Sequence, residues 1–144
     1  MKEYTIKETQ EKIAKKYREQ MVFDLKRVFL QFITLVLINK DAKYAYEIKA
    51  DILLYTRGGF DIDRNNLYKK LRTLEHDGIL ISTMEPSIRG AQRKYYKLTP
   101  LGKRLLMETH NVLFPLMKSL RQNITKVVDF DASVKKFTGY HGLH

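Results

Sequence analysis

Residues 64–102 read RNNLYKKLRTLEHDGILISTMEPSIRGAQRKYYKLTPLG, and their pattern predicts a helix, a hairpin and the start of another helix. Its first part has the spacing of an amphipathic helix over residues 64–77. The apolar stripe of that helix is formed by Leu67, Leu71 and Leu74. Asp63 stands where a helix N-cap is expected, and Gly78 stands where a glycine ends a helix.

A hairpin and another helix follow. Residues 79–84 and 93–98 have the composition of strands, and the loop between them contains proline and glycine. Thr99-Pro100 then combines a hydroxyl N-cap with proline at the first helical position. We therefore expect a helix that begins at Pro100 and runs to about residue 128, although Pro115 should kink or break it.

Two core helices are expected upstream, over residues 24–39 and 44–57, the first of them capped by Asp24. Before them, residues 5–22 alternate acids and bases around a thin apolar stripe. An isolated helix of this length is marginal in water, so we expect it to be an arm that packs against something. A dimer arm, an extension that contacts phosphates and a solvated helix all remain open for it.

The order of these elements predicts a mainly α protein with a small β-hairpin (α+β), a winged helix-turn-helix fold. We expect a helical arm over residues 1–23, a winged helix domain over 24–99, a dimerisation helix over 100–128 and a weakly ordered tail over 129–144. Apolar residues near heptad spacing predict a helix–helix seam in the dimerisation helix. That seam consists of Leu106, Leu113, Leu116, Met117, Leu120, Ile124 and Val127.

Charge and composition narrow the range of partners. The chain has 144 residues, with 27 Lys and Arg against 16 Asp and Glu, which gives a formal net charge of +11. Such an excess favours a polyanion, nucleic acid before an acidic membrane surface. The absence of cysteine excludes disulfides and thiolate chemistry. The N-terminus lacks an apolar signal segment, and the apolar run at Val28–Ile38 is too short to span a bilayer, so we expect a cytoplasmic protein without membrane attachment.

The exposed face of the helix over residues 64–77 carries the side chains that read bases. Arginine pairs with guanine and asparagine with adenine in the major groove. We expect base contacts from Arg64, Asn65, Asn66, Tyr68, Lys69 and Arg72. Basic residues beside this helix and on the hairpin should contact phosphates or enter the minor groove. These residues are Lys70, Arg89, Arg93, Lys94 and Lys97.

The same motifs resemble those of the PadR-like transcriptional regulators. The signatures of that family occur here as Tyr46-Glu47-Ile48, as Asn66-Leu67-Tyr68, and in residues 71–80 and 93–102. The resemblance covers residues 25–106 in continuous order. One departure is Lys69, which stands where the family often has proline and adds a positive charge to the presumed DNA face.

The resemblance implies a homodimer joined through C-terminal helices, with two recognition helices presented to double-stranded DNA. It also implies repression, in some members relieved by a small-molecule effector, whose identity the sequence does not define. The residues themselves also favour a dimer, because two winged helix domains make twice as many phosphate contacts as one.

Other functions are less well supported. No phosphate-binding loop, catalytic constellation or closed metal site is recognisable, so we expect neither an enzyme nor a cofactor or metal. His141 and His144 alone are too few ligands for zinc. The alternative that remains is an architectural or segregation protein of the same fold that binds DNA with low specificity, because the net charge fits that role equally well.

Overall fold

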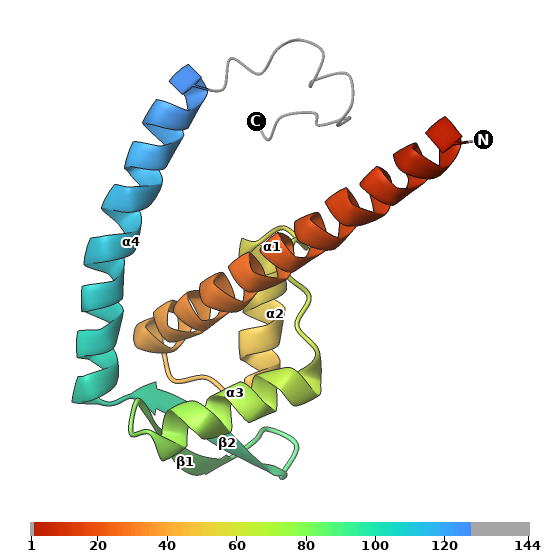
Figure 1. The fold of residues 1–144 in the computed structure, drawn as a ribbon. Helices are drawn as coiled ribbons and strands as arrows, with labels where there is room; N and C mark the ends of the chain where they lie inside the picture. The colour runs from red at the N-terminus through yellow and green to blue at the C-terminus, as the bar shows by residue number, and fades with distance from the viewer. Residues whose placement is uncertain (1, 128–144) are drawn as a thin grey trace. The chain divides into compact units, whose positions relative to one another are not determined.

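Four helices and one hairpin make up the described chain, residues 2–127 of a computed structural model (Figure 1). The elements are α1 (Lys2–Lys40), α2 (Ala45–Tyr55), α3 (Arg64–His76), β1 (Leu80–Pro86), β2 (Gln92–Leu98) and α4 (Pro100–Val127). This is a mainly helical winged helix fold, as the order of the motifs predicted. The chain divides into two compact units after Leu106. The expected tail at 129–144, with His141 and His144, lies outside the described residues.

Helix α1 is continuous, and the predicted boundary at Asp24 is wrong. No glycine or proline occurs in residues 1–40, so nothing interrupts the helical hydrogen bonds. The Asp24 carboxylate accepts a hydrogen bond from the Gln20 amide nitrogen at 3.1 Å and lies 3.9 Å from Arg27. Asp24 is therefore a surface residue in mid-helix and does not cap a helix.

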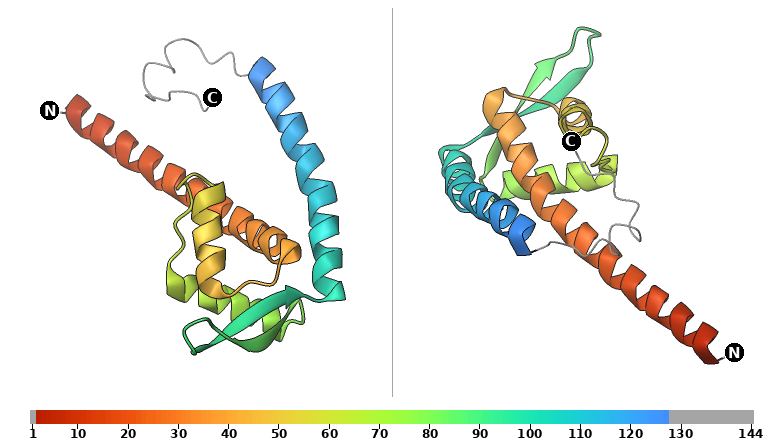
Figure 2. Two further views of the ribbon diagram at one scale, coloured as in Figure 1. Left: turned by 180° about the vertical axis from the view of Figure 1, so that it is seen from behind. Right: turned by 90° about the horizontal axis from the view of Figure 1, so that it is seen from above.

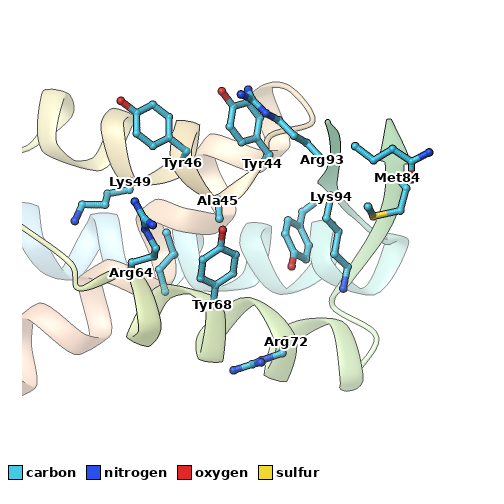
Figure 3. A pocket seen from close by; sticks show the side chains of 13 residues that line it. Tyr44, Ala45, Tyr46, Lys49, Arg64, Tyr68, Arg72, Met84, Arg93 and Lys94 are labelled. Atoms are coloured by element: carbon cyan, nitrogen blue, oxygen red, sulfur yellow. The ribbon is translucent and has the colours of Figure 1, made fainter. Parts of the chain in front are cut away.

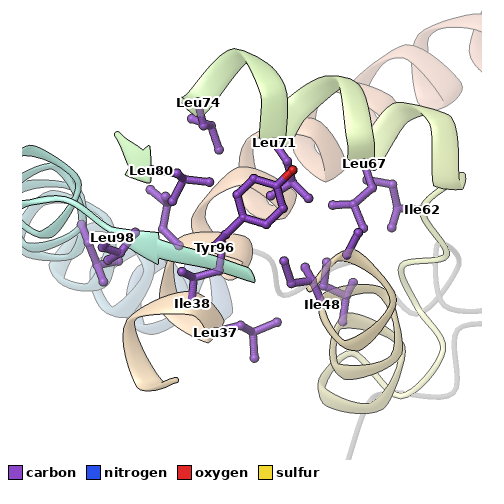
Figure 4. Close-up of a cluster of buried hydrophobic side chains, with 14 residues drawn as sticks. Leu37, Ile38, Ile48, Ile62, Leu67, Leu71, Leu74, Leu80, Tyr96 and Leu98 are labelled. Carbon is purple, nitrogen blue, oxygen red and sulfur yellow. The ribbon is translucent and has the colours of Figure 1, made fainter. Parts of the chain in front are cut away.

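The core lies where the second half of α1, the helices α2 and α3, the hairpin and the first turns of α4 meet (Figure 4). Its most deeply buried side chains are Leu35, Ile48, Ile52, Leu67, Leu71, Leu80 and Tyr96. Thr34 is the buried polar residue of this cluster, and its hydroxyl donates to the Leu30 carbonyl at 2.8 Å. Apolar burial from every element explains why α3 and the hairpin hold fixed places in this unit.

Helix α4 differs from the prediction in two respects. Leu106 is only 7% exposed and belongs to the winged helix core, so its assignment to the dimer seam is wrong. A heptad pattern does not distinguish a stripe that faces the chain's own core from one that faces a second chain. The helix also continues through Pro115, which forfeits one hydrogen bond while the turns on either side keep theirs.

Strands β1 and β2 pair antiparallel, with Leu80 opposite Leu98 and Pro86 opposite Gln92. The hairpin projects from the helices of its unit (Figure 2). A further backbone pairing extends it, because the Lys43 N–H donates to the Tyr96 carbonyl at 3.2 Å and the Tyr96 N–H donates to the Lys43 carbonyl at 2.9 Å. The connection between α1 and α2 is thereby joined to the hairpin.

A tight joint connects the end of α3 to the start of α4. Gly78 has a φ of 74°, and the Ile79 N–H donates to the Leu74 carbonyl at 2.9 Å, as in a glycine-terminated helix. The Thr99 hydroxyl lies 2.6 Å from the Gly78 carbonyl and accepts from the Gly102 N–H at 3.0 Å. Thr99 therefore caps α4, as predicted. A Cβ on Gly102 would lie 2.2 Å from the Ile79 carbonyl oxygen, so only glycine fits there.

Replacement of Gly102 by alanine is expected to destabilise the protein by about 1–3 kcal/mol, because the added methyl forces the backbone of Ile79 away. Urea unfolding at one fixed protein concentration measures the loss. The matched control is Lys103→Ala, an exposed neighbour on the same helical turn, for which we expect no comparable loss. Equal midpoints for the two variants would contradict the close approach.

Candidate nucleic-acid interface

Helix α3 presents a basic surface because its inward face is wholly apolar. The Asp63 carboxylate accepts from the Asn66 N–H at 3.1 Å and caps the helix, as predicted. The leucine stripe is buried, and the opposite face is open to solvent. The exposed residues include all of the expected base-reading side chains, Arg64, Asn65, Asn66, Tyr68, Lys69 and Arg72.

The exposed side chains of α3 divide between two hollows. Arg64, Tyr68 and Arg72 line a groove of about 650 Å³ on the side of α2 and the hairpin. Asn66 and Lys69 line a second hollow on the side of α1. The helical pattern alone did not separate these two sets.

The groove beside the hairpin is lined by positively charged side chains. Its lining comes from the start of α2, from α3 and from both strands (Figure 3). Every charged side chain in the lining is a cation. These cations are Lys49, Arg64, Arg72, Arg93 and Lys94.

Aromatic rings hold one wall of this groove in place. The Arg93 guanidinium lies over the Tyr44 ring at 4.4 Å from its centroid, and the Tyr95 ring meets Tyr44 edge-on at 5.4 Å. Tyr44 is itself fixed at the start of α2, where its N–H donates to the Glu47 carboxylate at 3.2 Å. A guanidinium on an aromatic face keeps its edge N–H groups available for a phosphate. Tyr96, the next residue along β2, is only 2% exposed, so one tyrosine of the pair is in the core as expected.

Lys94 is already paired. Its ammonium lies 2.7 Å from the Glu75 carboxylate, which also accepts a hydrogen bond from the Ser82 hydroxyl. The hydrogen bond from Lys94 lowers the pKa of Glu75, and the same contact raises the pKa of Lys94. Both directions stabilise the charged forms, so the pair contributes no net charge to the surface and joins α3 to β1 and β2.

Most other cations of this surface form no ion pair with a described residue. They are Arg64, Lys69, Arg72, Arg89, Arg93 and Lys97. Lys70 is half-buried and donates to the Gln31 side-chain oxygen at 3.0 Å, so it connects α3 to α1. Lys49 does form an ion pair, since its ammonium lies 3.5 Å from the Asp61 carboxylate, which is largely exposed.

The lining residues that were not predicted include Tyr44, Tyr46 and Lys49 at the start of α2. Tyr46 and Lys49 are three residues apart, which places them on one face of α2. The Tyr46-Glu47-Ile48 motif could have indicated which side of α2 faces solvent, because Ile48 is buried and Tyr46 is exposed. A buried neighbour identifies the solvent face of a helix once the helix has been placed.

Beyond Leu106, α4 carries an exposed apolar stripe. Leu116, Met117, Leu120 and Ile124 are 41–52% exposed, and Leu113 is half-buried. The side chain of Val127 lies outside the described part of the chain. A helix that leaves such a stripe exposed to water is typical of one that packs against another chain.

The model of the transcriptional regulator PadR-like family matches residues 34–108. The chain belongs to this family. The match covers the last two turns of α1, then α2, α3 and the hairpin, and the first turns of α4. These elements position the cationic surface. The family consists of transcriptional regulators and not of enzymes, so DNA-binding regulation is the general activity of the chain.

Similar proteins agree with this membership. An uncharacterized protein from Lysinibacillus sphaericus is 35% identical over 85 residues, 59% of this chain and 78% of that protein. A transcriptional regulator from Clostridium thermocellum is 25% identical with a TM-score of 0.60, over 74% of this chain and 96% of that one. A PadR family regulator from Eggerthella lenta is also 25% identical with a TM-score of 0.60, over 82% and 97% of the two chains.

Metal sites and membrane-spanning helices were two further features to consider in this PadR-family chain. Within residues 2–127, no three His, Asp or Glu side chains gather in a way that suits a metal ion. None of the helices in this part of the chain combines the length and the apolar character that a membrane span needs.

The ion pair between Lys94 and Glu75 predicts how substitutions at these two residues affect DNA binding. The substitution Lys94→Met leaves Glu75 as an uncompensated anion beside the DNA, so binding to every duplex should weaken. The double substitution Glu75→Gln with Lys94→Met removes both charges and should restore most of the lost affinity. Titration of duplex DNA at several salt concentrations measures both variants.

Arg93→Met is the comparison, because Arg93 has no ionic partner among the described residues. Its loss should reduce the slope of log affinity against log salt by about 0.9, the value for one phosphate contact. A double variant as weak as Lys94→Met would show that Lys94 binds phosphate directly.

Proposed function

We propose that this chain is a sequence-specific regulator that binds double-stranded DNA as a homodimer and represses transcription in the cytoplasm. The observation that carries the proposal is the set of unpaired cations on one surface of α3 and the hairpin. An ordinary solvated surface mixes acids with bases. Every charged side chain that lines the groove beside the hairpin is instead a cation, and the neighbouring acid Glu75 is paired with Lys94.

In the proposed complex, α3 enters the major groove. Asn65, Lys69 and Arg72 face outward from the leucine stripe and meet base edges. Arg64 and Tyr68 lie at the groove on the side of α2, where they meet the edge of the same base pairs or the adjoining sugar. Asn66 and Lys70 flank this face on the side of α1.

The hairpin supplies contacts that do not depend on sequence. Arg93 and Lys97 lie on β2, and Arg89 lies in the exposed turn that precedes it. In the proposal these cations bind backbone phosphates, and Arg89 enters a narrow minor groove. Phosphate contacts set the register of the protein, while α3 supplies the discrimination.

Dimerisation is proposed through the exposed stripe of α4. Two chains joined by a two-fold axis would place two copies of α3 on successive turns of one face of the duplex. Half-sites about 10–10.5 bp apart are then expected. Repression follows where such an operator overlaps a promoter, and an in vitro transcription assay on that promoter tests it.

The deciding experiment compares two duplexes of equal length, the region upstream of the protein's own gene and a scrambled sequence. Each is titrated at about 50 mM and about 200 mM salt. A preference that persists at the higher salt supports base reading by a specific regulator. Equal affinities that fall together with salt would overturn it in favour of the architectural alternative.

A further inference from the structure

The tip of the hairpin presents an apolar side chain beside a cation. Ile88 is fully exposed to solvent, more so than any other large apolar residue that the structure describes. Its neighbour Arg89 is also exposed and forms no ion pair with a described residue. The nearest acid in the sequence is Glu85 on β1, which accepts a hydrogen bond from the Thr83 hydroxyl at 3.4 Å. The core does not use Ile88, so the whole side chain is available to a partner.

A short turn fixes Ile88 and Arg89 at this position. The Gly90 N–H donates to the Ser87 carbonyl at 2.9 Å, and the Ser87 N–H donates to the Ala91 carbonyl at 2.8 Å. Gly90 has a φ of 82°, so the loop is a turn that a left-handed glycine closes. The usual residues of such a turn are Gly, Pro, Asn, Asp and Ser. An isoleucine, whose branched side chain has little χ1 freedom to lose on contact, stands there instead.

The hairpin is long enough to carry this tip beyond the groove that α3 is proposed to enter. Ser82 pairs with the buried Tyr96, and from that pair to Ile88 the strand and turn extend by up to about 20 Å. The hairpin projects from the helices of its unit along this length (Figure 2). The major groove is about 12 Å wide. With α3 in the major groove, the tip therefore passes the bordering phosphates and reaches the adjacent minor groove.

We propose that Ile88 reads the width of the minor groove that flanks the site of α3. This groove is about 6 Å wide in ordinary B-DNA, and it is narrower in A-tracts. In a narrow groove the isoleucine side chain meets the deoxyribose rings of both strands and displaces water from them, whereas in a wide groove it meets one wall only. Ile88 is thus a specificity-determining residue that favours A·T-rich flanks. Arg89 supplies the charge that the negative potential of the same groove attracts.

This inference deepens the proposed function and rests on its placement of α3 and the hairpin on DNA. It does not depend on base reading by α3, on repression or on a dimer. Ile88 can therefore be tested on duplexes that contain no operator.

The test compares a duplex of repeated A-tracts with a duplex of G·C pairs of equal length. Ile88→Ala should lower the affinity for the A-tract duplex about fivefold, because part of the buried apolar surface is lost, and should change the affinity for the G·C duplex by less than about twofold. The slope of log affinity against log salt should not change, because the substitution removes no charge. Arg89→Ala should lower that slope by about 0.9, the value for one phosphate contact.

Ile81→Ala is the matched control, because it makes the same substitution at an exposed isoleucine of β1 away from the turn. It should bind both duplexes as the natural chain does. Ile88→Leu keeps the apolar bulk and should retain most of the affinity for the A-tract duplex. Both Ile88 variants should unfold at the urea midpoint of the natural chain, since Ile88 belongs to no part of the core.

Netropsin, a small ligand of the A·T minor groove, gives a second measurement on the same duplexes. When it fills the groove of the A-tract duplex, the natural chain and Ile88→Ala should bind that duplex equally. A difference that persists in the presence of netropsin would place Ile88 outside the minor groove and overturn the proposal.

An equal loss of affinity for both duplexes in Ile88→Ala, or no loss for either, would also overturn it. So would a lower salt slope in Ile88→Ala, because the substitution would then act through Arg89. If the upstream and scrambled duplexes are bound equally, the specific regulator fails while the A-tract result stands. If the upstream duplex is preferred but Ile88→Ala changes nothing, only the reading of groove width fails.

Discussion

Replacement of Leu120 by glutamate is expected to convert the protein into a folded monomer. Leu120 is 47% exposed on the stripe of α4, so the substitution does not disturb the core of the single chain. A carboxylate in an apolar seam loses its hydration without gaining a partner, which disfavours association. A monomer contacts one half-site, and loss of the linked second site should lower operator affinity by about 10²- to 10⁴-fold. Sedimentation gives the oligomeric state, and duplex titration gives the affinity.

Ser119→Glu is the matched control, because it adds the same carboxylate at the preceding position of α4, where the natural residue is exposed and polar. It should remain dimeric with nearly natural affinity. A Leu120→Glu protein that still sediments as a dimer would place the seam elsewhere. A natural chain that is monomeric at micromolar concentration would overturn the homodimer.

Arg72→Ala is expected to remove discrimination at one or two base positions and to leave general DNA affinity largely intact. Arg72 is exposed on α3, forms no ion pair with a described residue and belongs to no part of the core. A bidentate arginine–guanine contact contributes about 1–3 kcal/mol of discrimination, so the preference at that base pair should fall by roughly 5- to 150-fold. Affinities for a panel of duplexes with single base-pair changes measure it, and Asn65→Ala should act at a different position.

Lys97→Ala is the control for this experiment, because Lys97 lies on β2 and is expected to contact only phosphate. It should weaken binding to all duplexes of the panel by one factor and lower the salt dependence. If Arg72→Ala gave that same uniform pattern, α3 would not read bases through Arg72.

The sequence predicted the local features of the fold well. The spacing of Leu67, Leu71 and Leu74 placed α3 and its buried face, and Asp63 and Thr99 proved to be the caps that their chemistry indicated. Each of these signals lies within one turn of the residues that it organises. Helix faces and caps can be predicted from sequence because they depend on residues that are close together in the chain.

Features that depend on distant neighbours were missed or misplaced. The pairing of Lys43 with Tyr96 joins two segments far apart in sequence, and a single paired residue has no periodicity. Leu106 belongs to the chain's own core although it continues the same stripe as Leu120. Lys94 was predicted to contact phosphate, but it forms an ion pair with Glu75, which lies 19 residues earlier in the sequence. The basic face of α3 was predictable, but its division between two hollows required the placement of α1 and α2.

The continuity of α1 has a mechanical consequence. A straight helix of 39 residues is about 58 Å long. Its first half presents Ile6, Ile13 and Tyr17 to solvent, and its second half contributes Leu35 and Ile38 to the core. Glycine and proline, residues at which helices often bend, are absent from α1. A partner that bound the N-terminal half would therefore be coupled through one continuous helix to the packing against α2 and β2.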